Sequence, residues 1–249
     1  MTPPITVRRD AFDAVLFDLD GVLTPTAALH ARCWKATFDA VLAEHERHTG
    51  EHEPPFDAEA EYVAHVDGKS RHDGVHDFLR ARAILVPEGE PSDGPDVWSV
   101  YGIGNRKQAL VERELAGGSI DPFPGSVQWV RELRAAGVRT AVVSSSVNCT
   151  AVLRAAGILG LFDLTVDGGD VARLGLRGKP APDGFLVAAH RLHVVPRRAV
   201  VVEDALAGVP AGHAGGFGLV VGVARTAEHA QLRAAGADLV VDDLEELAA

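Results

Sequence analysis

The sequence predicts an α/β fold, in which a core built on a doubly wound parallel sheet carries an inserted helical cap domain. Short apolar runs alternate with helical stretches over most of the chain, a pattern typical of a parallel sheet with helices on both faces. The first run, 14–17, is followed directly by Asp18-Leu19-Asp20-Gly21, so it reads as a buried strand that ends in polar residues. The alternation stops between residues 26 and 120, which indicates the insertion.

The alternation of apolar runs and helical stretches predicts the strands and helices of the core domain. We predict core strands at 14–17, 138–143, 161–166, 199–202, 217–223 and 239–241, and core helices at 126–136, 148–156, 183–192, 206–214 and 227–235. The core domain is therefore predicted to comprise residues 1–25 and 121–249, and the cap domain residues 26–120.

The insertion has its own pattern. Residues 30–46 and 73–83 have helical periodicity, and residues 88–96 form an acidic loop rich in proline and glycine. Gly102-Ile103-Gly104 resembles part of a dinucleotide-binding loop, but it lacks the third glycine and the preceding strand. We therefore predict a turn there and no nucleotide site.

The composition narrows the classes of function. The 249 residues carry a net charge of −11 and no basic stripe, which argues against a nucleic-acid partner. No apolar run approaches the roughly 18 residues that span a bilayer, and residues 1–10 lack the apolar segment of a secretory signal. Cys33 and Cys149 make no disulfide framework. These features predict a cytoplasmic protein that binds a small molecule, as a monomer or weak dimer, with no membrane or nucleic-acid partner.

Polar residues collect where the predicted strands end. Asp18 and Asp20 follow the first strand, Ser144 and Ser146 the second, and Glu203 with Asp204 a later one; Gly178-Lys179-Pro180 lies in a connecting loop. Open α/β sheets bind ligands beyond the carboxyl ends of their strands. The sequence therefore predicts that carboxylates, hydroxyls and one lysine converge on one rim.

This set of residue types suits phosphoryl transfer. A carboxylate such as Asp18 can attack phosphorus and form an acyl phosphate. Attack on a phosphate dianion needs neutralising charge, which Mg²⁺ and Lys179 would supply; Asp18, Asp20 through its backbone oxygen, Glu203 and Asp204 are the candidate metal ligands. Asp20 faces the same side as Asp18, so it is the candidate acid and base.

Each cluster taken alone has an ordinary structural explanation. Asp and Gly often terminate a strand, Ser144-Ser145-Ser146 could be a plain strand-to-helix turn, and Glu203-Asp204 could cap a helix. A single lysine is usually solvated, and Trp34 at a helical position is more often core than ligand contact. The ordered assembly of all four clusters is what favours a site.

These motifs resemble the haloacid dehalogenase superfamily of phosphatases and phosphomutases. Asp18-Leu19-Asp20-Gly21-Val22 is similar to its first motif, Ser144 to its second, Lys179 to its third, and Glu203-Asp204 to its fourth. The resemblance covers nearly the whole chain and includes a helical cap after the first strand. It implies Asp18 as nucleophile, Asp20 as acid and base, and Mg²⁺ as cofactor.

A closer resemblance is to the beta-phosphoglucomutase-like subfamily. Asp18 through Thr26, followed by His30 and Trp34, matches its first region, and Val66-Asp67-Gly68-Lys69-Ser70-Arg71 looks like its phosphate-binding loop. The resemblance implies that His30 positions Asp20. It also implies substrate contacts for Ser70, Arg71, Ser144, Ser146, Asn148, Trp34 and Thr26.

Three functions follow as hypotheses. The first is a sugar phosphomutase that interconverts beta-glucose 1-phosphate and glucose 6-phosphate, because the rim and Arg71 offer two phosphate sites. The second is a magnesium-dependent sugar-phosphate phosphatase with the same first half-reaction. The third, a phospho-aspartate signalling domain, would need no insertion as long as this one.

Overall fold

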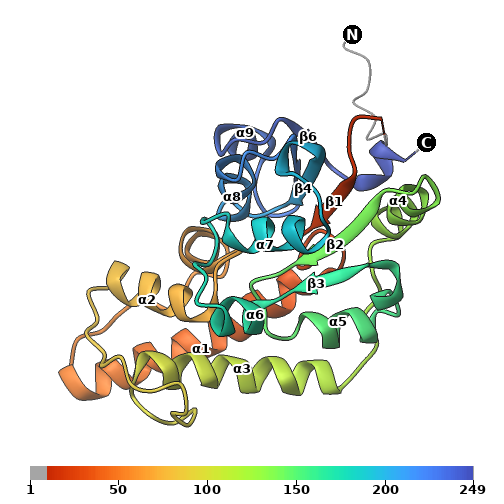
Figure 1. Cartoon of the computed structure of the whole chain (residues 1–249). Coiled ribbons are helices and arrows are strands. Elements are labelled where there is room, and N and C mark those ends of the chain that lie inside the picture. The colour runs from red at the N-terminus through yellow and green to blue at the C-terminus, as the bar shows by residue number, and fades with distance from the viewer. Residues whose placement is uncertain (1–9, 249) are drawn as a thin grey trace. The chain divides into compact units, whose positions relative to one another are not determined.

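The computed structural model describes residues 10–248, and the chain divides into two compact units (Figure 1). One unit comprises Met1–Pro25 and Ser119–Ala249, here called the core unit, and the other comprises Thr26–Gly118, here called the inserted unit. The expected absence of a secretory signal in residues 1–10 falls almost entirely outside the described residues. The predicted location and oligomeric state stay predictions.

The core unit is built on one six-stranded sheet in the order β3-β2-β1-β4-β5-β6. All of its strand pairs are parallel. The strands are β1 (Ala14–Phe17), β2 (Arg139–Val143), β3 (Leu164–Val166), β4 (Ala199–Glu203), β5 (Leu219–Val223) and β6 (Leu239–Val241). The predicted α/β class with a doubly wound parallel sheet is confirmed.

Helices alternate with these strands along the chain. They are α4 (Pro124–Ala135), α5 (Cys149–Ala155), α6 (Gly168–Arg173), α7 (Asp183–Arg191), α8 (Gly208–Ala214) and α9 (His229–Ala234), with short 3₁₀ turns at Leu159–Leu161, Pro196–Arg198 and Leu244–Leu247. Helix α7 packs on β1, β2 and β3, and α8 packs on β4 and β5. The sheet is therefore covered by apolar helix faces, which is why its central strands are apolar throughout.

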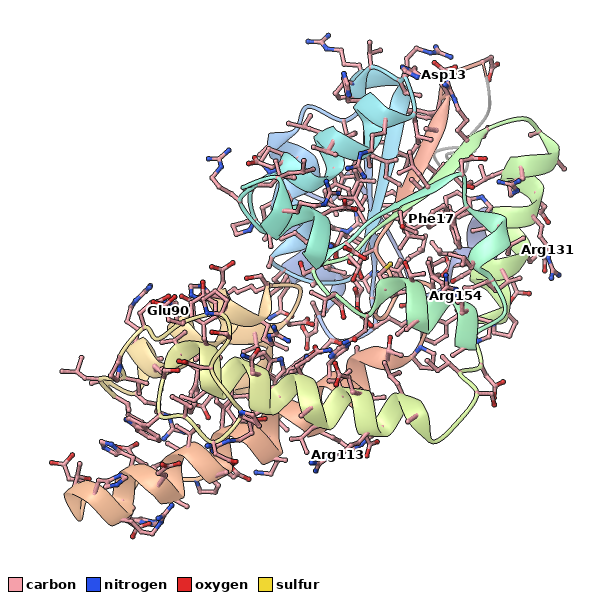
Figure 2. The ribbon with its side chains drawn as sticks, turned by 60° about the horizontal axis from the view of Figure 1, so that its bottom comes forward. Asp13, Phe17, Glu90, Arg113, Arg131 and Arg154 are labelled. Carbon is pink, nitrogen blue, oxygen red and sulfur yellow. The ribbon has the colours of Figure 1, made fainter. Side chains whose placement is uncertain are left out.

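The buried strand β1 lies at the centre of the sheet. Its four residues are fully buried, and Phe17 at its end packs edge-on against Trp129 of α4 with ring centroids 5.6 Å apart. Figure 2 shows Asp13, which directly precedes this strand, Phe17 at its end, and Arg131 on the outer side of α4. Apolar packing thus fixes the position at which Asp18 emerges.

The chain leaves the core unit and returns to it at neighbouring points. The N–H of Phe123 donates to the carbonyl of Leu23 at 3.0 Å, and the hydroxyl of Ser126 donates to the carbonyl of Val22 at 2.7 Å. The segment that follows β1 is therefore tied directly to the start of α4, although the inserted unit separates them in sequence.

The inserted unit contains α1 (Thr26–Thr49), a π-helical turn (Tyr62–Val66), α2 (Arg71–Ala81) and α3 (Val100–Ala116). Its core is a cluster of rings in which Phe38 stacks on Phe78 with centroids 3.9 Å apart and on Trp34 at 4.8 Å. Trp34 is only 4% exposed and belongs to this cluster. The apolar stripe of α1 is thus explained by packing.

Two expectations about local structure were wrong. The predicted turn at Gly102-Ile103-Gly104 lies inside helix α3, because Ser99 caps that helix by accepting a hydrogen bond from the N–H of Gly102 at 2.9 Å. The predicted strand 161–166 begins only at Leu164, and residues before it form a 3₁₀ turn. A serine cap outweighed the low helix propensity of the glycines.

Within residues 10–248, the structure has no helix that combines the length and the apolarity needed to cross a membrane.

Candidate active site

Three strand ends of the core unit place the predicted rim residues. Asp18 is the first residue after β1, and its N–H continues the ladder by donating to the carbonyl of Val202 at 2.9 Å. Ser144 follows β2 and donates in the same way to Val166 at 3.0 Å, and Glu203 is the last residue of β4. Because β1 lies between β2 and β4, these side chains emerge at one edge of the sheet.

Lys179 connects two of these carboxylates. Its ammonium nitrogen lies 2.5 Å from Asp18 Oδ1 and 2.5 Å from Glu203 Oε1, and it also donates to the carbonyl of Val143 at 3.2 Å. All three charged side chains are less than a tenth exposed. The contact with Asp18 is a charge-assisted hydrogen bond, and the contact with Glu203 is a buried ion pair.

Burial shifts the pKa values of both partners. Burial raises the pKa of Asp18 well above its ordinary value; the Lys179 ammonium lowers it, and the Glu203 and Asp20 carboxylates raise it. Burial alone would lower the pKa of Lys179, but Asp18 and Glu203 outweigh this effect and raise it. One ammonium group therefore faces more negative charge than it can neutralise.

The loop after β4 holds Glu203 and Asp204 by close packing. Glu203 Oε2 accepts from the N–H groups of Asp204 and Ala205, both at 3.1 Å. A Cβ on Gly208 would lie 1.8 Å from Glu203 Oε1. A glycine at this position is therefore what leaves room for the carboxylate.

A similar close approach occurs after Asp20. Gly21 has φ +92°, which side-chain-bearing residues rarely adopt, and a Cβ there would lie 1.8 Å from Asp204 Oδ2. The glycine of the Asp18-Leu19-Asp20-Gly21 sequence thus makes space for Asp204, whose side chain is 1% exposed.

The carboxylates form a group that fits a divalent cation. Ligand atoms of Asp18, Glu203 and Asp204 all lie within 4.8 Å of one another, and all three residues are buried. Hard oxygen donors of this kind are the ligands that Mg²⁺ prefers. A divalent cation would also supply the positive charge that Lys179 alone does not.

Ser144, Ser146 and Asn148 line the turn between β2 and α5. The Ser144 hydroxyl lies 3.5 Å from Asp20 Oδ2 and accepts from the Ser146 N–H at 3.0 Å. Ser146 in turn accepts from the Asn148 N–H at 3.1 Å. The hydroxyls of Ser144 and Ser146 therefore stabilise this turn. Their contacts are compatible with a plain strand-to-helix turn and also with a role in substrate binding.

His30 of the inserted unit has a partner that the sequence did not reveal. The Lys107 ammonium donates to His30 Nδ1 at 2.7 Å and lies 5.0 Å from the centre of the Trp34 ring. Because Nδ1 accepts this bond, the neutral ring carries its proton on Nε2. Thr26, the first residue of α1, is buried in the same unit.

Arg71 and Ser70 lie at the start of α2. Arg71 Nη1 is buried and has no hydrogen-bond partner among residues 10–248. Burial lowers the pKa of Arg71, and Glu112 raises it. A buried donor of this kind suits an anionic ligand. Ser70 has a structural role as the helix cap, since its hydroxyl accepts from the Asp73 N–H at 3.1 Å.

We predict that Lys179→Met destabilises the core unit when divalent ions are absent. The free energy of unfolding should fall by about 3–5 kcal/mol, because two buried carboxylates would lose their counter-charge. The measurement is urea unfolding followed by circular dichroism. Arg177→Met is the matched control, since that side chain is 76% exposed and an exposed ion pair contributes little to stability. Equal effects of the two substitutions would contradict the prediction.

We also predict that Gly208→Ala destabilises the chain by about 1–3 kcal/mol, because the added methyl group must displace the Glu203 carboxylate. Gly160→Ala is the control, since no atom lies within 4 Å of a Cβ there. Thermal unfolding of both variants measures the difference. Two equally stable variants would show that Glu203 does not depend on the glycine.

The chain is similar to known proteins in both sequence and structure. The model of the haloacid dehalogenase-like hydrolases matches residues 12–216. Beta-phosphoglucomutase of Mycobacterium tuberculosis is 51% identical over 237 residues, which cover 94% of this chain and 90% of that protein. The structure of beta-phosphoglucomutase from Clostridium difficile is similar with a TM-score of 0.75 at 25% identity, covering 95% of this chain and 93% of that one.

A further similar structure is that of CbbY from Rhodobacter sphaeroides in complex with xylulose-(1,5)bisphosphate. It has a TM-score of 0.71 at 28% identity, and the match covers 95% of this chain and 96% of that one. The similarity to all these proteins extends across both units of the chain.

Proposed function

The chain belongs to the haloacid dehalogenase-like hydrolase family, within its beta-phosphoglucomutase-like group, and on that premise we propose that it is a sugar phosphomutase. The proposed reaction interconverts beta-glucose 1-phosphate and glucose 6-phosphate. The observation that carries the proposal is the buried cluster at the end of β1, where Asp18 lies 2.5 Å from the Lys179 ammonium beside further carboxylates.

In the proposed first half-reaction, an Asp18 oxygen forms a bond to one phosphorus of the sugar 1,6-bisphosphate while the bond from that phosphorus to its sugar oxygen breaks, which leaves a sugar monophosphate. Lys179 neutralises charge on the phosphoryl oxygens, and Asp20 gives its proton to the leaving sugar oxygen. Mg²⁺, held by Asp18, the Asp20 backbone oxygen, Glu203 and Asp204, would supply the charge that offsets repulsion between nucleophile and phosphate.

The second half-reaction passes the phosphoryl group from Asp18 to a free hydroxyl of a sugar monophosphate, which regenerates the bisphosphate. Asp20, now ionised, takes the proton of that hydroxyl, and the bond between Asp18 and phosphorus breaks. A sugar that carries a second phosphate needs another cation, and we propose Arg71 for it. The buried Nη1 of Arg71, which lacks a hydrogen-bond partner among the described residues, supports this assignment. We propose that His30 positions Asp20 and that Ser70, Ser144, Ser146, Asn148, Thr26 and Trp34 contribute to substrate binding.

A sugar-phosphate phosphatase is the second candidate. It shares the first half-reaction, and water then takes the phosphoryl group from Asp18. The hydrolase description of the family favours it. Exclusion of water after phosphoryl transfer to Asp18 is what distinguishes a mutase from a phosphatase.

Product analysis tests the proposed function. With beta-glucose 1-phosphate, a trace of the 1,6-bisphosphate and Mg²⁺, we expect glucose 6-phosphate to accumulate, as measured by ³¹P NMR. Chelation by EDTA should stop the reaction, and added Mg²⁺ should restore it. Inorganic phosphate as the main product would favour the phosphatase instead, and full turnover in EDTA would remove the metal assignment.

Asp18→Asn should abolish turnover and leave the fold intact, because an amide oxygen is a poor nucleophile towards phosphate. Mass spectrometry of the acid-quenched wild type should find phosphate on the peptide that contains Asp18. Asp13→Asn, at the other end of β1, is the matched control and should stay active. Full activity of Asp18→Asn would refute the nucleophile assignment.

Arg71→Ala should raise KM for a sugar bisphosphate by about 10- to 100-fold, since hydrogen bonds to charged groups contribute roughly 1.5–3 kcal/mol. Arg80→Ala on the same helix is the control, because Arg80 is 77% exposed and paired with Asp77. Steady-state kinetics with the bisphosphate measures both variants. An unchanged KM for Arg71→Ala would remove the case for a second phosphate site.

A further inference from the structure

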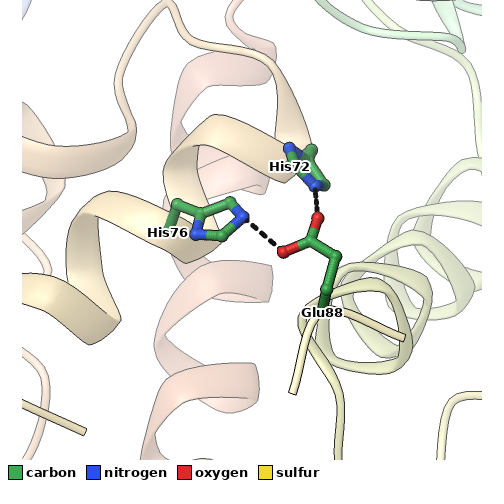
Figure 3. A group of neighbouring side chains, drawn as sticks. All are labelled: His72, His76 and Glu88. Atoms are coloured by element: carbon green, nitrogen blue, oxygen red, sulfur yellow. Dashed lines mark hydrogen bonds and ion pairs between the residues drawn. The ribbon is translucent and has the colours of Figure 1, made fainter. Parts of the chain in front are cut away.

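Two histidines and a glutamate of the inserted unit converge on one another (Figure 3). His72 Nε2 lies 2.5 Å from Glu88 Oε1, and His76 Nε2 lies 2.9 Å from Glu88 Oε2. One ligand atom from each residue lies within 4.8 Å of the others. All three residues belong to the inserted unit, so the group does not depend on how the two units are arranged.

The local structure explains why the three side chains meet. His72 and His76 are one turn apart on α2, so their rings project from the same helix face, and their centroids are 4.6 Å apart. Glu88 lies in the loop before α3, and backbone bonds hold that loop: Val100 donates to the Pro87 carbonyl at 2.9 Å and Tyr101 to that of Glu88 at 3.3 Å.

We propose that His72, His76 and Glu88 bind a divalent transition-metal ion, with Zn²⁺ as the occupant. Two imidazole nitrogens and one carboxylate oxygen are a ligand set that zinc takes with one further position left to water. Imidazole ligands favour zinc over Mg²⁺, which prefers oxygen donors throughout. The carboxylate cluster of the core unit therefore suits a different ion.

Binding requires only a local rearrangement of protons. In the present arrangement, each Nε2–H donates to the Glu88 carboxylate. A neutral imidazole can instead carry its proton on Nδ1, which turns Nε2 into a lone-pair donor. The three donor atoms would then separate slightly to admit an ion at about 2.0–2.2 Å from each. No residue has to move to another element.

Exposure makes the group accessible to an ion from solution. The side chains of His72 and His76 are 37% and 38% exposed, and that of Glu88 is 52% exposed. Solvent can therefore complete the coordination. The bound ion would tie α2 to the loop before α3, next to Tyr101, whose ring centroid lies 4.8 Å from that of His72.

The experiment is calorimetric titration of the full chain with ZnCl₂ after treatment with a chelator. We expect the wild type to bind one zinc ion more per chain than His72→Ala or Glu88→Gln. Removing a residue that only hydrogen-bonds to a metal ligand typically weakens metal binding by roughly 10- to 100-fold. Each of these substitutions removes a ligand itself, so it should weaken zinc binding by more than that. Comparing stoichiometries separates this ion from any zinc held by the core carboxylates. Far-UV circular dichroism checks that each variant is folded.

The matched control is the double variant that carries both His45→Ala and His52→Ala. These histidines lie in the same unit and also contact glutamates, His52 with Glu46 at 3.1 Å and His45 with Glu51 at 3.9 Å, but they do not converge on one carboxylate. This variant should keep the wild-type stoichiometry. Crystals soaked in zinc should give an anomalous peak between His72, His76 and Glu88. Equal zinc stoichiometry in wild type and His72→Ala, or a peak only at the core carboxylates, would overturn the proposal.

Discussion

The shortage of positive charge at the end of β1 is the constraint on which the rest of this structure depends. Three buried carboxylates, those of Asp18, Glu203 and Asp204, lie close together, and one ammonium group, that of Lys179, contacts two of them. Charges cannot be buried in this way without compensation. The apolar strands that fix these positions, the glycines that give the carboxylates room and the loop that delivers Lys179 all serve this one arrangement.

Part of this charged cluster could be predicted from the sequence. Asp18, Ser144 and Glu203 were predictable because each ends an apolar run, and the ends of parallel strands meet at one edge. The pairing of Lys107 with His30 could not be predicted. The two residues are far apart in the sequence, and a lysine on a helix usually faces water. Only packing of α3 against α1 brings them to 2.7 Å.

The local structure around Gly102 and Gly104 and the burial of Trp34 were harder to predict. Gly102 and Gly104 lower helix propensity, so the sequence around them favoured a turn. The Ser99 cap and the packing of α3 against α1 and α2 outweigh that preference. Trp34 had two interpretations from its spacing alone, and stacking on Phe38 accounts for its burial. Tertiary packing decided the role of Trp34, whereas the Ser99 cap of α3 is a local signal that the sequence already contains.

The adjacent exit and return of the chain have a consequence for how this protein tolerates change. Leu23 and Phe123, which flank the inserted unit in sequence, are joined by a backbone hydrogen bond, and the Ser126 hydroxyl donates a second hydrogen bond to the Val22 carbonyl. The two ends of the core unit that flank the inserted unit are thus held together by their own hydrogen bonds, independently of the residues between them. Loop-closure entropy rises only slowly with length. The intervening segment can therefore be lengthened, shortened or exchanged while the strand that presents Asp18 keeps its place.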